Sequence, residues 1–196
     1  MVWLAADKFN NRKCINKYLY IANFPFSVYN YPRSVMIMVR AKLKKPKDRS
    51  IATKGFEKFL FYLVQFTWGL PVNGISGIIY LILRKKYRTE KFYNSYITYI
   101  PGNWGGLSLG LFIFIAEGKA EGWTNNTKIH EYGHTIQCLL LGPLYWIVVA
   151  LPSAIWCNFF ADYRKKNNVS YYKLYCESWA NSWGVKWSGL KQYGIK

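Results

Sequence analysis

The segment His130-Glu131-Tyr132-Gly133-His134 contains the only two histidines in the chain. Residues four positions apart lie on one face of a helix, so both imidazoles can point at a single ion. Histidine is a common neutral ligand of zinc, and the glutamate between the pair is suited to act as a general base on a zinc-bound water. The pattern H-E-x-x-H therefore predicts metal-assisted hydrolysis. The alternative is a helix whose histidines make unrelated hydrogen bonds in the core.

Capping and helix-breaking residues indicate where the helix that carries this motif begins and ends. Asn126 or Thr127 can cap its start, and Gly142-Pro143 ends it. The polar residues before the cap are expected to form a loop. The motif is therefore predicted to lie on one helix of about four turns.

Segments on both sides of the motif predict a mixed fold. Residues 96–100 and 107–116 are rich in β-branched and aromatic side chains and bounded by glycine or proline, which is typical of strands. Residues 171–183 predict a second helix, ending at Gly184. The expected fold class is α+β, a mainly helical zincin-like core with a small β-sheet, and residues 1–196 are expected to form a single domain.

The composition combines a large positive charge with many aromatic residues. The 196 residues include 27 Lys and Arg against 9 Asp and Glu, a net charge of +18, and 19% are aromatic. Nucleic-acid binding would explain the charge, but not the apolar content of 52%. Membrane-interface proteins use Trp, Tyr and basic residues together, so an anionic lipid surface is the expected partner and nucleic acid is not. The first 58 residues are the most basic region.

Two apolar stretches could contact that membrane. Residues 59–83 and 135–161 carry no charged side chain and are long enough to cross a bilayer. The first stretch has glycine and proline in its middle and basic clusters on both sides, which favours a re-entrant hairpin over a single span. The second is interrupted at Gly142-Pro143 and at Pro152. The prediction is two apolar helical hairpins, embedded in the membrane or lying at its interface, with the site on the cytoplasmic side.

A catalytic zinc needs a third protein ligand and one open position. Cys138 continues the helical series after His134, but it lies about 12 Å along the axis from His130, too far to share an ion. Asp162 begins a basic run and is expected at the surface, and the remaining alternatives Glu117 and Glu121 lie in the expected loop. Glu177, inside the second helix, is the favoured ligand.

The residues around Glu177 complete a resemblance to a known class. The motif followed by Glu177-Ser178-Trp179-Ala180-Asn181 resembles the E-x-x-A-D of gluzincin metallopeptidases, which include the CaaX prenyl proteases and bacterial heat-shock membrane peptidases. Residues 130–137 are also similar to a group of short bacterial proteins. The resemblance covers the two motifs and the apolar layout. It departs at Asn181, where an aspartate is expected.

The resemblance implies that His130, His134 and Glu177 bind zinc and that Glu131 activates water. It also implies that Asn181 does not contact the zinc but forms a hydrogen bond with one of the zinc-binding residues. It also implies an upstream strand, within residues 107–115, that aligns the substrate. It supplies no residue to stabilise the oxyanion.

Two functions follow from the sequence. The first is a membrane-associated zinc metallopeptidase that acts on a peptide or protein and has a core over residues 96–190. The second is a non-catalytic cationic membrane-binding or assembly protein whose zinc site is structural or vestigial. A structural site would have four protein ligands, and Cys176 is the candidate for the additional one.

Overall fold

The structure is a computed structural model that describes residues 55–192. This part of the chain is mixed α+β, about 64% helical, with a small four-stranded mixed sheet, which confirms the predicted fold class at that level. Most of the basic region 1–58 lies outside the described residues.

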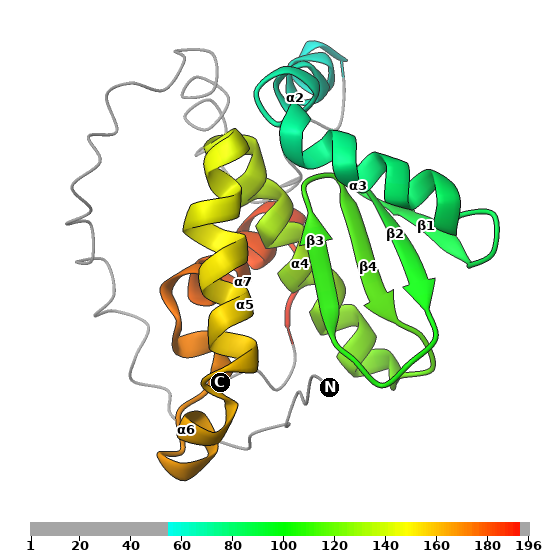
Figure 1. The fold of residues 1–196 in the computed structure, drawn as a ribbon. Coiled ribbons are helices and arrows are strands. Elements are labelled where there is room, and N and C mark those ends of the chain that lie inside the picture. Colours follow the sequence, from blue (N-terminus) through cyan, green and yellow to red (C-terminus); the bar gives the residue numbers. More distant parts are fainter. Residues whose placement is uncertain (1–54, 193–196) are drawn as a thin grey trace.

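Two helices precede the four strands of the sheet in the sequence, and the remaining helices follow them (Figure 1). The helices and strands are α2 (Gly55–Thr67), α3 (Leu70–Leu83), β1 (Thr89–Phe92), β2 (Ser95–Ile100), β3 (Gly106–Leu109), β4 (Phe112–Ala116), α4 (Glu121–Leu141), α5 (Leu151–Asn158), α6 (Ala161–Lys166) and α7 (Tyr175–Ser188). Short 3₁₀ turns η2 (Gly142–Leu144) and η4 (Tyr171–Lys173) and a π-helical turn η3 (Trp146–Ala150) connect them.

The sheet has the strand order β1-β2-β4-β3. Strands β2 and β4 are parallel, and β1 and β3 pair with them in the antiparallel sense. All five residues of β4 are buried, as expected for an apolar central strand. Strand β3 is an edge strand and lies beside α4 (Figure 1).

The sequence prediction of one strand over residues 107–116 was wrong, because the chain turns there to make the hairpin β3–β4. Gly110 takes a left-handed conformation (φ +67°), which glycine adopts without steric cost. A Cβ at Gly110 would lie 2.2 Å from Oδ1 of Asn73. That oxygen accepts a 2.7 Å hydrogen bond from the backbone N–H of Leu111. A side chain of α3 therefore fixes the turn.

Helix α4 begins earlier than predicted and ends where predicted. Its N-terminal flanking residue is Ala120, not Asn126 or Thr127, so the expected loop is helical from Glu121. The Thr127 hydroxyl donates to the carbonyl of Trp123 one turn back instead of capping. At the other end Gly142 takes φ +53° and stops the helix.

Helices α4 and α7 cross at very short range. A Cβ at Gly133 would lie 1.9 Å from the carbonyl oxygen of Ala180, and a Cβ at Gly184 would lie 2.0 Å from that of Ile129. The prediction that Gly184 ends its helix was therefore wrong, since α7 continues to Ser188 and ends at Gly189 (φ +71°). Two glycines, one from each helix, let the backbones touch.

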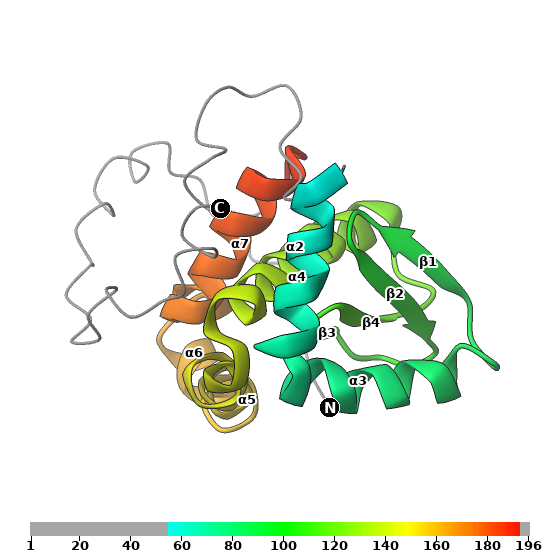
Figure 2. The same cartoon turned by 90° about the horizontal axis from the view of Figure 1, so that it is seen from above.

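Both apolar stretches are bent. Helices α2 and α3 meet at 92°, and the helical segments before and after residue 145 meet at 118°. Figure 2 shows α2 passing over α4 while α3 turns away along the sheet. Within residues 55–192 no single helix is long and apolar enough to cross a membrane, although each bent pair meets those criteria when its two parts are taken together. The second stretch turns at Gly142-Pro143, and Pro152 lies inside α5.

Candidate metal centre

Helices α4 and α7 bring His130, His134 and Glu177 together. The two histidines lie one turn apart on α4, and Glu177 lies in the first turn of α7. Oε2 of Glu177 is 3.0 Å from Nε2 of His130 and 3.5 Å from Nε2 of His134. All three side chains are buried, and one potential ligand atom from each lies within 4.8 Å of the others. This group could hold a metal ion.

Asn181 orients the ring of His130. Oδ1 of Asn181 is 2.8 Å from Nδ1 of His130, and it also accepts a 3.2 Å hydrogen bond from Nε2 of Gln192. Because the Gln192 amide donates to Oδ1 of Asn181, the Asn181 atom that faces the imidazole is an oxygen acceptor. Nδ1 of His130 therefore carries the proton and donates it to Asn181. The lone pair of His130 is thereby left on Nε2, the atom that faces Glu177. Asn181 therefore contacts His130 through its oxygen, although the motif has an aspartate at this position.

Gln137 holds His134 in the same way, and the sequence analysis did not single it out. Its Oε1 is 2.6 Å from Nδ1 of His134, while its Nε2 donates a 2.8 Å hydrogen bond to the carbonyl of Cys176. The sequence contained a sign of this contact, because Gln137 follows His134 by three residues and residues at this spacing share a helix face. Outer hydrogen bonds of this kind fix the tautomer of a metal-binding histidine.

These hydrogen bonds leave a set of electron-pair donors pointing at one another. Glu177 is fully buried, and its Oε2 has no hydrogen-bond partner of good geometry. Burial raises the pKa of this carboxyl, but Coulombic attraction to the imidazoles of His134 and His130 and N–H donation from them outweigh burial and hold the pKa well below its usual value. When Asn181 and Gln137 hold the Nδ1 protons, the neutral rings instead turn their lone pairs toward this carboxylate, which is costly unless a cation lies between them. Two nitrogens and one carboxylate oxygen are ligands typical of catalytic zinc.

Glu131 lies beside this group and faces strand β3. A Cβ at Gly106 would be 2.4 Å from Oε1 of Glu131, so the glycine leaves room for the carboxyl group. Burial raises the pKa of Glu131 to about 7, with His130 lowering it and Glu177 raising it. A carboxyl group that titrates near neutral pH can both accept and return a proton.

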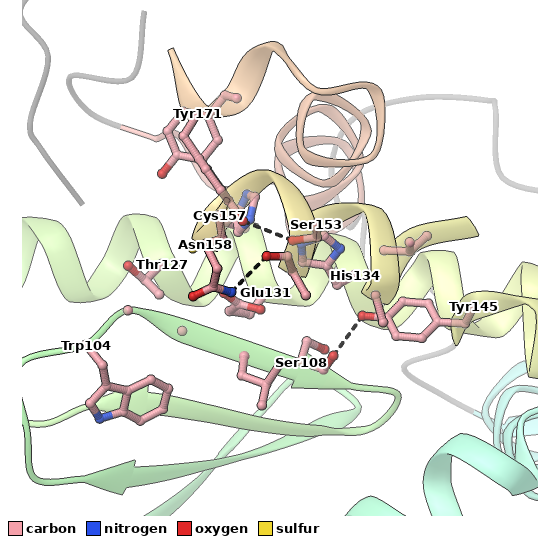
Figure 3. A pocket seen from close by; sticks show the side chains of 18 of the residues that line it. Trp104, Ser108, Thr127, Glu131, His134, Tyr145, Ser153, Cys157, Asn158 and Tyr171 are labelled. Carbon is pink, nitrogen blue, oxygen red and sulfur yellow. Dashed lines mark hydrogen bonds between the residues drawn. The ribbon is translucent and has the colours of Figure 1, made fainter. Parts of the chain in front are cut away.

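The group of His130, His134 and Glu177 lies beside a cavity of about 300 Å³, which the two histidines line (Figure 3). Strand β3 forms one wall, α4 the floor with Glu131, and α5 the opposite wall with Ser153, Cys157 and Asn158. Tyr171 and Tyr172 of η4 also line it. A cavity of this size suits one or a few side chains of a substrate.

The other candidate ligands lie elsewhere. Cys138 and Cys176 belong to the same buried apolar cluster, where burial raises the pKa of each thiol to about 12 and disfavours the thiolate that binds metal. Asp162 is exposed in the first turn of α6, and Glu121 is exposed in that of α4. Glu117 approaches Arg88 at 3.9 Å.

No protein-family model, curated protein or solved structure matches the chain. The resemblance to gluzincins therefore rests on the motif residues alone.

Proposed function

We propose that the protein is a zinc-dependent metallopeptidase. The observation that supports this most is the convergence of His130 Nε2, His134 Nε2 and the unpartnered Oε2 of buried Glu177 beside a cavity. A zinc ion bound there would lower the pKa of water to near 7 and polarise a carbonyl. Glu131 would accept the proton of the attacking water and return it to the leaving amine.

Strand β3 favours an extended peptide as substrate. It is an edge strand, and Gly106, Leu107 and Ser108 line the cavity next to Glu131. Edge strands offer backbone groups that can pair with another chain. Tyr145 donates to the carbonyl of Ser108 at 2.7 Å, so that carbonyl is already engaged and the peptide would pair nearer Gly106.

The alternative of a structural zinc site requires a fourth protein ligand. Among residues 55–192 the group consists of three ligands, with Cys176 in the neighbouring apolar cluster. The cavity adjoins the three ligands and gives room for water and a substrate carbonyl. These two observations favour hydrolysis over a purely structural role.

Removing zinc is expected to abolish proteolysis and to destabilise the fold. Without a cation, the buried carboxylate of Glu177 has only the two imidazoles beside it. A ligand at about 1,000 times its Kd contributes about 4 kcal/mol to the free energy of unfolding, and this contribution would be lost. The measurement is cleavage of a fluorescent peptide library and thermal unfolding after chelation, then after adding back zinc or, as a control, magnesium. Full proteolysis by zinc-free protein would contradict the proposal.

We also propose that the protein binds the surface of an anionic bilayer. Both bent helical pairs expose large apolar side chains, and a basic run follows each pair at residues 84–86 and 164–166. The most exposed of these side chains are Phe56, Phe59, Ile75, Ile78, Leu81, Ile82, Ile147 and Leu151, and the exposed Phe159 directly follows the second pair. Apolar patches next to basic residues are typical of interfacial membrane proteins.

Vesicle flotation tests this second proposal. The protein is expected to float with vesicles that contain phosphatidylserine, and less with pure phosphatidylcholine or at high salt, because basic residues contribute about 1 kcal/mol each near an anionic surface. Ile78→Glu, at a side chain that is 63% exposed on α3, should weaken binding several-fold. Ser182→Glu, on exposed α7 surface, adds the same charge and is the control. Equal binding by both variants would argue against this surface.

A further inference from the structure

Three tyrosines lie close to Glu177 in the sequence, and the structure gives each a different environment. The hydroxyl of Tyr171 is 3.0 Å from Oγ of Ser153, and that of Tyr175 donates to the carbonyl of Val148. Among residues 55–192 the hydroxyl of Tyr172 has no hydrogen-bond partner, and its side chain lines the cavity. The three positions are therefore not equivalent.

The ring of Tyr172 lies against a proposed zinc ligand. Its centroid is 5.3 Å from that of His130, and the two rings meet edge to face at 64°. The short turn η4 sets this position, since Oγ of Ser170 accepts a 3.3 Å hydrogen bond from the backbone N–H of Tyr172. The same turn leads directly into α7, so one segment positions both Tyr172 and Glu177.

Hydrolysis of an amide develops negative charge on the carbonyl oxygen, and hydrogen-bond donors aimed at that oxygen lower the barrier. Most other side-chain donors around the cavity already have a partner. Trp104 donates to the carbonyl of Ile100, Thr127 to that of Trp123, Tyr145 to that of Ser108 and Asn158 to that of Ala154. Arg164 uses two of its five N–H groups on the carbonyls of Cys157 and Phe160, and its guanidinium lies near the rings of Trp156 and Tyr171. The Tyr172 hydroxyl, by contrast, is available.

We propose that the hydroxyl of Tyr172 donates a hydrogen bond to the substrate carbonyl oxygen as that oxygen becomes negatively charged. This inference rests on the proposed peptidase function and adds the group that the motif does not supply. A phenol keeps its proton at neutral pH, so it is a donor throughout the reaction. No proton leaves Tyr172, because Glu131 handles the proton of the attacking water.

The test compares Tyr172→Phe with Tyr175→Phe. Each variant loses one hydroxyl, but Tyr175 lies outside the cavity and donates to backbone. We expect Tyr172→Phe to lower kcat by about 10²–10³-fold with KM nearly unchanged, which is the usual effect of removing one oxyanion donor. It should also weaken binding of a phosphinic peptide, a mimic of the tetrahedral intermediate, by about tenfold or more. Zinc content should be unchanged in both variants.

The outcomes separate this inference from the proposed function. If Tyr172→Phe keeps the kcat and the phosphinic-peptide affinity of the wild type, the role of Tyr172 is wrong even though the enzyme is a zinc peptidase. If Tyr175→Phe loses as much as Tyr172→Phe, the effect is structural and the inference also fails. Wild-type protein that binds no zinc or cleaves no peptide would overturn the proposed function itself.

Discussion

Replacing Glu131 with glutamine is expected to lower kcat for peptide hydrolysis by about 10²–10⁴-fold, the range that general-base catalysis contributes. Glutamine has nearly the same shape, so it fits the space beside Gly106, but its amide cannot accept the proton of water. Zinc binding should persist because Glu131 is not one of the three proposed ligands. The measurement is steady-state kinetics together with the zinc content of the purified variant.

A matched control is Glu121→Gln, in the first turn of the same helix, where the side chain is exposed and lies outside the cavity. This change should leave kcat and zinc content at the wild-type level. Full activity of Glu131→Gln would show that another group activates water. Loss of zinc from Glu131→Gln would show that the carboxyl group supports the metal site rather than the chemistry.

Gly133→Ala is expected to force α4 and α7 apart. The new Cβ would lie 1.9 Å from the carbonyl oxygen of Ala180, a backbone atom that cannot move aside like the end of a side chain. Overpacking usually costs about 1–3 kcal/mol, and a collision with backbone belongs at or above the upper end. Because Glu177 reaches the histidines through this helix contact, we expect zinc affinity to fall as well. Chemical denaturation and zinc titration measure the two effects.

Gly122→Ala is the control for this change. It lies on the same helix, and a Cβ there meets no atom within 4 Å. Alanine in an exposed helical position stabilises by about 0.5–1 kcal/mol relative to glycine, so this variant should be as stable as the wild type or more stable. A Gly133→Ala protein with wild-type stability and zinc affinity would contradict the close contact of α4 with α7.

The sequence supported the expectation that the histidines share one helix face, because helical periodicity is a local property. The association of Glu177 with them is not local, and it depends on the contact between α4 and α7. The glycine signal was misread for the same reason. Gly184 looks like a helix terminator, but in the structure it allows that contact, and sequence alone does not separate these two uses of glycine.

Of two further errors, one has a nonlocal cause and the other a local one. The turn at Gly110 is fixed by Asn73, a side chain from α3, so a single long strand was the natural reading of residues 107–116. The start of α4 was placed too late because Thr127 is a good capping residue in isolation. In the structure its hydroxyl bonds to Trp123 inside the helix. A tertiary contact therefore decides the turn, whereas a hydrogen bond within the helix takes up the Thr127 hydroxyl.

The central claim is that Glu177 completes a zinc site with His130 and His134. Anomalous diffraction at the zinc edge, from crystals of the zinc-loaded full-length protein, tests it most directly. We expect one zinc peak about 2.0–2.2 Å from Nε2 of each histidine and from a carboxylate oxygen of Glu177, with the remaining position free of protein ligands. A peak that lacks Glu177, a peak with a cysteine sulfur among its ligands, or no peak between these helices would contradict the claim.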